Sequence, residues 1–145
     1  MSRYVSVKER QIIGERASYC CEYCQLPETD SYYGFQADHI ISWRHGGITH
    51  VENLAYACPD CNRNKGADVG TILQDANVFV RFYNPRRDSW SDHFDLQYSG
   101  AILPKSDIGL ATVKILDMNH PDRVIERALL IRIAIMKPSS TENKG

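Results

Sequence analysis

Four cysteines of the chain form two pairs with the same short spacing. Cys21 and Cys24 enclose two residues, and Cys58 and Cys61 enclose two more. A C-x2-C turn directs two thiolates toward one point, and two such turns supply the four sulfur ligands of a tetrahedral Zn²⁺ site. The spacing therefore predicts one structural zinc ion per chain, held by two knuckles with a long segment of chain between them.

Two alternatives accompany this interpretation. The four cysteines could be ordinary buried residues or a redox-active C-x2-C pair. A fifth cysteine, Cys20, is adjacent to Cys21 and could replace it as a ligand, although C-x3-C is the rarer spacing. We interpret Cys20 as a small buried hydrophobe.

The segment between and just behind the knuckles carries side chains suited to phosphodiester chemistry. Asp38 and His39 are neighbours, Asn53 follows in the same segment, and Asn62 comes directly after the last cysteine. A carboxylate and an amide offer the oxygen ligands that Mg²⁺ prefers, and an imidazole can accept a proton near neutral pH. The alternative is a turn or capping role for Asp38 and a buried, hydrogen-bonded role for His39.

Together, these features closely resemble the HNH endonuclease family. The resemblance rests on the Asp-His doublet in ADHIISW, the Gly46-Gly47 loop, the Asn53-Leu54 pair and the closing CPDCNRNKG. It covers residues 21–66, and it implies the ββα-metal fold. The segments NPRR and WSDHF that follow resemble those of small bacterial HNH proteins more loosely.

The resemblance also implies a role for each site residue. His39 would be the general base, and Asn53 would hydrogen-bond the backbone of the loop so that His39 is aimed. Asp38 and Asn62 would hold a catalytic Mg²⁺ or Mn²⁺ ion. Asn62 stands where many members have a third histidine, which favours Mg²⁺ over transition metals. Gly66 stands where some members add a ligand, so metal binding without DNA is expected to be weak.

The Asp-His doublet constrains the local backbone. Successive residues of a regular strand point to opposite sides of a sheet. Asp38 and His39 could therefore face one phosphate only at a bulge or at the end of a strand, and we expect one of these here.

Basic side chains near the motif are candidates for contacts with DNA phosphates, which dominate nucleic-acid affinity. The alternative for each is a solvated surface position, and none of them suggests base readout. We expect His45 and His50 to be solvated loop residues, and His93 to pack among aromatic side chains. The candidate phosphate contacts are Arg44, Arg63, Lys65, Arg86 and Arg87.

The elements that must position these residues follow from periodicity and turn signals. Helices are predicted over residues 7–19, 62–69, 107–118 and 122–136. Strands are predicted over residues 35–43, 54–57, 78–83 and 93–98. The predicted fold class is α+β, with a ββα-metal core and two zinc knuckles extended by C-terminal strands and helices. We expect a single HNH nuclease domain over residues 1–137 and a disordered tail over residues 138–145.

The composition bounds the function. The chain has 145 residues, of which 43% are hydrophobic and 24% charged, and its formal net charge is −1. Such a chain can bury a core, and it has no global basic field, so a site for a polyanion must be local. No apolar run reaches the roughly 18 residues of a membrane span, and the polar N-terminus does not resemble a secretory signal. We therefore expect a cytoplasmic protein without a membrane partner.

These observations lead to one leading function and one alternative. The resemblance implies a metal-dependent endonuclease that hydrolyses DNA, with double-stranded DNA as the expected partner and a single-metal, histidine-base mechanism. Because the net charge suggests modest affinity, a partner protein or a homodimer would supply specificity. The alternative is a zinc module that binds nucleic acid or protein without catalysis.

Overall fold

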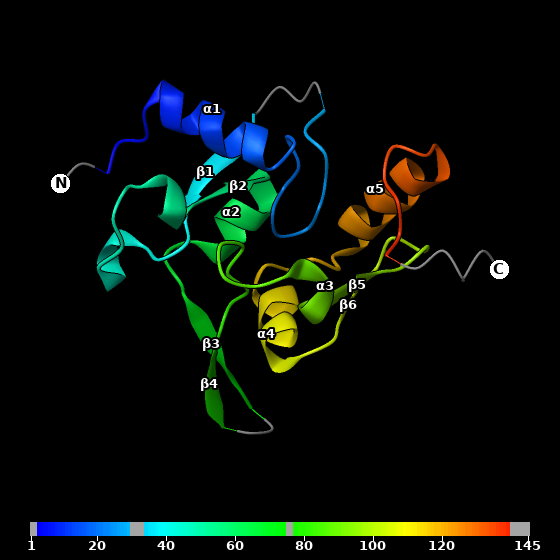
Figure 1. Cartoon of the computed structure of the whole chain (residues 1–145). Coiled ribbons are helices and arrows are strands. Elements are labelled where there is room, and N and C mark those ends of the chain that lie inside the picture. Colours follow the sequence, from blue (N-terminus) through cyan, green and yellow to red (C-terminus); the bar gives the residue numbers. More distant parts are fainter. Residues whose placement is uncertain (1–2, 30–33, 75–76, 140–145) are drawn as a thin grey trace. The chain divides into compact units, whose positions relative to one another are not determined.

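The computed structural model describes residues 3–29, 34–74 and 77–139, and it divides into two compact units (Figure 1). Unit 1 comprises Met1–Val69 and Asn84–Arg87, and unit 2 comprises Gly70–Tyr83 and Asp88–Gly145. The expected single domain over residues 1–137 stays a prediction. Of the expected tail, residues 140–145 lie outside the described residues.

Unit 1 contains the predicted order of strand, strand and helix. The strands β1 and β2 pair antiparallel, with Asp38 opposite Ala55 and His39 opposite Leu54. The α+β class and the ββα core are therefore confirmed. The elements of unit 1 are α1 (Val7–Arg16), β1 (Gln36–His39), η1 (Trp43–His45), η2 (Val51–Asn53), β2 (Leu54–Ala57) and α2 (Pro59–Lys65).

The helix α1 begins at a capping box. The Ser6 hydroxyl accepts a hydrogen bond from the Glu9 backbone N–H, and the Glu9 carboxylate accepts one from the Ser6 N–H. These bonds satisfy backbone donors that the first helical turn would otherwise leave free. The helix ends at Arg16, short of the predicted residue 19, because Ser18 and Tyr19 adopt positive φ values of 52° and 56°.

The helix α2 begins earlier than predicted. Pro59 occupies its first turn, where a missing N–H costs nothing, and the Cys58 sulfur accepts from the Cys61 N–H. The predicted start at residue 62 is therefore wrong, and so is the predicted end at residue 69, because the helix ends at Lys65. Gly66 follows with a φ of 54°.

The core of unit 1 combines apolar side chains with sulfur and polar groups. The strand β2 is buried along its whole length, and α1 packs against it. The fully buried side chains include Ile13, Tyr23, Leu54, Lys65 and the cysteines of both knuckles.

Unit 2 is built from two hairpins and two longer helices. The strand β3 pairs antiparallel with β4, and β5 pairs antiparallel with β6. The helix α4 packs on β3, β4 and β6. Its elements are β3 (Gly70–Leu73), β4 (Val78–Arg81), α3 (Trp90–His93), β5 (Phe94–Leu96), β6 (Ile102–Pro104), α4 (Asp107–Ile115) and α5 (Pro121–Arg132).

The core of unit 2 is mainly apolar. It contains Phe94, Leu96, Ile102, Leu116, Met118 and Ile131. The strands β3 and β6 were not predicted, and the predicted strand over residues 93–98 is shorter because residues 90–93 form α3. Ser139 pairs with Leu96 through its backbone N–H and its hydroxyl, which ties the last described residue to β5.

Among the helices of the described chain, we find none whose length and hydropathy together would allow it to cross a lipid bilayer.

Candidate active site

The four paired cysteines converge on one buried point. Cys21 and Cys24 lie in the turn after α1, Cys58 caps α2, and Cys61 lies in its first turn. Their Sγ atoms all lie within 4.8 Å of one another, and the Cys24 and Cys58 sulfurs are 3.7 Å apart. A tetrahedral zinc site with bonds of about 2.3 Å has sulfur–sulfur edges of about 3.8 Å. The cluster can therefore bind one zinc ion.

The surroundings of the sulfurs agree with this assignment. The backbone N–H groups of Cys24 and Cys61 approach the sulfurs of Cys21 and Cys58 at 3.5 and 3.4 Å. Burial raises the pKa of the Cys21 and Cys61 thiols well above the usual value. Without a cation these groups would stay protonated, whereas zinc binds them as thiolates.

Cys20 is not one of the clustered cysteines. Its side chain is half-buried, and its sulfur contacts the Ser18 carbonyl at 3.6 Å. Cys21 is the member of the cluster, so the alternative ligand set with Cys20 is wrong. The expected burial of Cys20 is only partly found.

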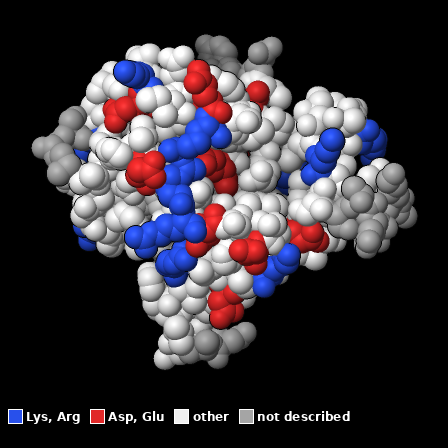
Figure 2. Space-filling model, viewed as in Figure 1, with Lys and Arg blue, Asp and Glu red and all other residues white. Residues whose placement is uncertain are grey.

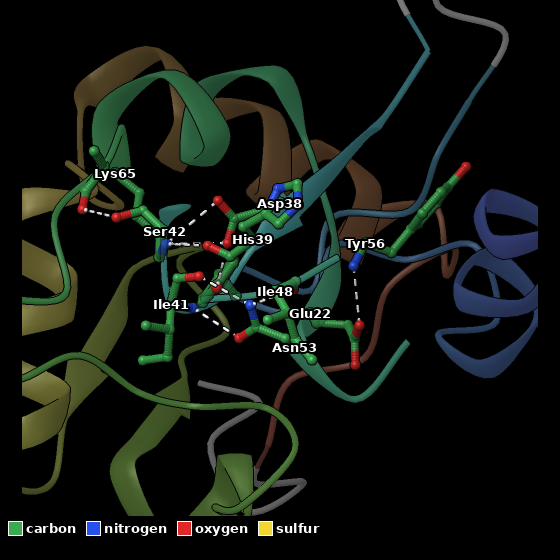
Figure 3. Close-up of polar contacts among 11 residues, drawn as sticks. Glu22, Asp38, His39, Ile41, Ser42, Ile48, Asn53, Tyr56 and Lys65 are labelled. Carbon is green, nitrogen blue, oxygen red and sulfur yellow. Dashed lines mark hydrogen bonds and ion pairs between the residues drawn. The ribbon is translucent and has the colours of Figure 1, made fainter. Parts of the chain in front are cut away.

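Asn53 connects the two sides of the loop that follows β1. Its carbonyl Oδ1 accepts from the Ile41 N–H at 2.9 Å, and its Nδ2 donates to the carbonyls of Ile41 and Ile48, each at 2.9 Å (Figure 3). The Asn53 backbone carbonyl accepts from Ile40, again at 2.9 Å. One side chain therefore closes the loop that leads from β1 to β2.

The same loop requires a glycine beside Asn53. A Cβ atom on Gly47 would lie 1.6 Å from the Ile41 carbonyl oxygen and 2.9 Å from Asn53 Nδ2. Gly46 adopts a φ of 85°, which disfavours other residues there. The Gly46-Gly47 pair thus permits a close approach that any side chain at position 47 would block.

His39 is the last residue of β1, so the expected strand end is confirmed. Its ring is half-buried, and Nε2 lies 2.8 Å from the Thr49 hydroxyl. Thr49 belongs to the loop that Asn53 closes. Within the described chain, the other ring nitrogen, Nδ1, has no hydrogen bond. The imidazole is therefore anchored at one ring nitrogen, Nε2.

Asp38 points into the unit, away from solvent. Its side chain is almost fully buried, and Oδ2 accepts a hydrogen bond from the Tyr23 hydroxyl at 2.7 Å. The Lys65 ammonium lies 3.3 Å from Oδ1 and 3.2 Å from Oδ2. Burial raises the pKa of Asp38, and the positive charge of Lys65 opposes that shift. The carboxylate is therefore already paired with a cation.

Lys65 requires a correction, because it was expected to face DNA. Only 1% of its surface is exposed, and its Nζ also donates to the His39 carbonyl oxygen at 2.9 Å (Figure 3). It is the last residue of α2, and this helix lies against β1. The last helical turn thus directs the ammonium at Asp38 instead of at solvent.

Asp38 and Asn62 are the two residues predicted to supply oxygen donors to a hard cation. Asn62 is half-buried in α2, and within the described residues its side-chain amide makes no hydrogen bond. An aspartate and an asparagine are ligands that suit Mg²⁺ or Mn²⁺. The donor types therefore fit such an ion. The Lys65 ammonium, however, already contacts both Asp38 carboxylate oxygens and the His39 carbonyl oxygen. Asp38 could contact a metal only if Lys65 moved away.

The other basic candidates divide by exposure. Arg44 and Arg87 are exposed, and Arg63 is exposed but pairs with Asp60 at 2.6 Å. Arg86 is a second correction: its side chain is 11% exposed and pairs with Glu22. Figure 2 shows the wider pattern, in which acidic side chains lie beside basic ones on the viewed face.

Three other histidines, His45, His50 and His93, were not expected at the site. His45 and His50 are exposed, and His50 Nδ1 accepts from the Glu52 N–H. His93 bonds the Ser106 hydroxyl at 2.6 Å, and its ring packs against Tyr83.

Two residues of the site escaped the sequence analysis. Tyr23 lies inside the first C-x2-C turn, where only its position between two ligands hinted at burial. Thr49 lies in a polar loop and carries no distinctive pattern. Their partners are distant in sequence, so spacing alone does not reveal them.

Residues 21–68 match the family model described as HNH endonuclease. No curated protein and no solved structure gives a significant match. The matched segment includes the Asp-His doublet, Asn53 and Asn62. Residues 21–68 are therefore similar to the HNH endonuclease family, and the matched segment contains both cysteine knuckles together with β1, β2 and α2.

Proposed function

We propose that the protein is a metal-dependent endonuclease that hydrolyses DNA phosphodiester bonds, with His39 as the general base. The observation that carries the proposal is the half-buried His39 imidazole, anchored at Nε2 by the Thr49 hydroxyl 2.8 Å away. A base needs a fixed ring and a free nitrogen, and this arrangement supports both. Positioned bases typically accelerate a reaction by about 10² to 10⁴-fold.

His39 would take a proton from the attacking water through Nδ1. If Nε2 carries the ring proton and donates it to Thr49, Nδ1 has the lone pair that accepts the second proton. Asn53 and Gly47 would act as positioning residues, because they hold the loop to which Thr49 belongs.

Asp38 and Asn62 would hold the catalytic ion, Mg²⁺ or Mn²⁺. When bound, such an ion stabilises negative charge on the phosphate and on the departing oxygen. Lys65 would first have to release Asp38. Asp38 would then offer a carboxylate and Asn62 an amide oxygen, and phosphate and water would complete the shell. Two protein ligands imply weak binding in the absence of DNA.

The contacts with DNA would come from exposed basic side chains. We assign phosphate contacts to Arg44, Arg63 and Arg87, because Lys65 is buried and Arg86 is largely covered, each in an ion pair with a carboxylate. With a net charge of −1, these contacts give modest affinity. Double-stranded DNA remains the proposed substrate, with a partner protein or a second copy adding specificity. The five cysteines form no disulfide, which suits the reducing cytoplasm.

Nicking of a supercoiled plasmid tests the proposal. We expect cleavage that requires added Mg²⁺ or Mn²⁺, and a loss of at least about 100-fold in the His39→Ala variant, since it removes the base. Thr49→Val should lose part of the activity, and Thr49→Ser should recover it because the hydroxyl returns. His45→Ala is the matched control, since His45 is an exposed histidine of the same loop. Cleavage at the wild-type rate by His39→Ala would refute the mechanism.

One observation favours the alternative, a zinc module that binds nucleic acid or protein without catalysis. The Asp38 carboxylate is buried and neutralised by Lys65, as in a purely structural ion pair. This alternative predicts that the protein binds DNA or a protein but leaves plasmid intact with every divalent metal tested. The plasmid assay therefore distinguishes the two functions.

A further inference from the structure

A tryptophan in the loop after β1 carries a cation on its ring. The central guanidinium carbon of Arg3 lies 4.7 Å from the centroid of the Trp43 ring. Trp43 is 41% exposed, and Arg3, in the segment before α1, is exposed as well. At this distance a guanidinium is attracted to an indole ring by a cation–π interaction. The contact therefore holds an exposed positive charge against the loop.

Trp43 belongs to the same loop that positions His39. The Ser42 carbonyl accepts a hydrogen bond from the Gly47 N–H at 2.9 Å, and Thr49 of this loop anchors the His39 ring. Trp43 follows His39 by four residues, so their Cα atoms lie at most about 14 Å apart. The loop therefore places the Trp43 ring, and the cation on it, near the candidate base.

The partner of Arg3 differs in kind from those of several other arginines in unit 1. A carboxylate neutralises the guanidinium that it orients, and a carbonyl occupies its donors. An aromatic ring orients a guanidinium without neutralising it, and the N–H donors stay available for an anion. Within the described residues, Arg3 makes no hydrogen bond and no ion pair. The arginines of unit 1 that donate to a carboxylate or a carbonyl are Arg10, Arg16, Arg63 and Arg86.

We propose that Arg3 binds a DNA phosphate beside the candidate active site, and that Trp43 is a positioning residue that holds the guanidinium there. Each DNA strand carries a phosphate about every 3.4 Å along the helix axis, so a cation near His39 meets a phosphate within a few nucleotides of the one that His39 faces. The chain has a net charge of −1, so attraction to DNA depends on such local cations. This inference rests on the proposed function, because it takes DNA as the substrate.

The salt dependence of DNA binding tests the contact. Fluorescence anisotropy measures the affinity of the full, zinc-loaded chain for a short labelled duplex without added Mg²⁺, at about 50 to 200 mM KCl. Arg3→Gln should weaken binding on the order of fivefold at the lowest salt concentration, and it should reduce the slope of log K against log salt concentration by about one. Arg3→Lys keeps the charge and should retain the slope.

Lys114→Gln is the matched control for the change in net charge. Lys114 is an exposed lysine on α4 of unit 2, and its loss should change neither the affinity nor the slope. Zinc content and urea denaturation should be the same in all variants, since Arg3 and Lys114 are both exposed. An Arg3→Gln variant with the wild-type slope would overturn the proposal.

A double-mutant cycle tests the role of Trp43. Trp43→Leu should weaken DNA binding by less than Arg3→Gln does, because the charge remains but is no longer oriented. The double variant should bind DNA like Arg3→Gln alone, since Trp43 acts through Arg3. If Trp43→Leu weakens binding equally in the presence and absence of Arg3, Trp43 contacts DNA itself and the assigned role is wrong.

Failure of this inference is distinguishable from failure of the proposed function. If the wild type binds DNA and nicks plasmid while Arg3→Gln keeps its affinity and slope, only the Arg3 contact is refuted. If Arg3→Gln loses one unit of slope but no variant nicks plasmid, the Arg3 contact is supported and hydrolysis is refuted. A wild type that does not bind DNA even at about 50 mM KCl would refute both.

Discussion

The two units of the chain stabilise their centres by different means, which a fully buried cation in each unit illustrates. In unit 1, Lys65 contacts a carboxylate and a carbonyl close to four clustered cysteines. In unit 2, Arg127 donates to the carbonyls of Gly100 and Met118 at 2.7 and 2.5 Å within an apolar core. The Lys65 ammonium neutralises a buried carboxylate, whereas the Arg127 guanidinium donates hydrogen bonds to two backbone carbonyls.

This difference indicates that the units should respond differently to the same perturbation. The core of unit 1 includes four buried, clustered cysteines besides its apolar side chains, so we expect its stability to depend on a metal ion that binds the four sulfurs. Unit 2 buries large apolar side chains from two hairpins and two helices, and its stability should not depend on metal.

The largest effect should follow loss of zinc from unit 1. We expect one zinc per chain, and we expect Cys58→Ser to lose it together with several kcal/mol of folding free energy. Hydrogen exchange should then show loss of amide protection in β1 and β2, with protection retained in β5 and β6. Cys20→Ser is the control and should keep its zinc. Folded, protected unit 1 without zinc would contradict the comparison.

Removal of the Lys65 charge should also destabilise unit 1, without changing its metal content. Lys65→Met leaves the Asp38 carboxylate buried and unpaired, which typically costs about 3 to 5 kcal/mol. The double variant Lys65→Met with Asp38→Asn removes both charges and should be more stable than Lys65→Met alone. Urea denaturation in saturating zinc measures the stability of the wild type and of the two variants. Equal stability of the single and double variants would mean that the pair is not coupled.

Removal of the Arg127 charge should destabilise unit 2 and leave unit 1 unchanged. Arg127→Met keeps an aliphatic side chain but leaves the Gly100 and Met118 carbonyls without this donor, at a cost of about 2 to 3 kcal/mol. Exchange protection should decrease in β5 and β6, with zinc content as in the wild type. If protection in β1 and β2 falls equally, the two units do not unfold separately.

The smallest effect concerns acid and the start of α1. The hydrogen bond from the Ser6 backbone N–H lowers the pKa of Glu9 below its usual value of 4.5. A carboxyl whose pKa is lower in the folded state stabilises the fold above the unfolded pKa, and this contribution disappears as pH falls through the folded value. Exchange protection of α1 should therefore decrease in that range in the wild type. In the Glu9→Gln variant, exchange protection of α1 should vary less over this pH range. If the variant and the wild type show the same pH dependence, the Glu9 carboxylate is not the group that stabilises α1.

The sequence alone was sufficient to predict those features that depend on residues close together along the chain. The two C-x2-C turns, the strand at residues 54–57 and the strand end at the Asp-His doublet follow from short spacings, which the covalent chain constrains. The family match over residues 21–68 rests on the same short motifs. The start of α2 depends on Pro59 and on the Cys58 cap, and both signals lie in the sequence, although the periodicity of residues 62–69 alone did not reveal them.

Tertiary packing decided the features whose partners are far apart along the chain. The direction of Lys65 depends on Asp38, 27 residues earlier, and a basic residue beside a motif is equally consistent with solvent or with a buried acid. Arg86 similarly pairs with Glu22, 64 residues away. The anchoring of His39 by Thr49 and the burial of Tyr23 against Asp38 also require the folded loop. Such side chains take their direction from the charge or donor that the fold brings near them, and no local pattern records that neighbour.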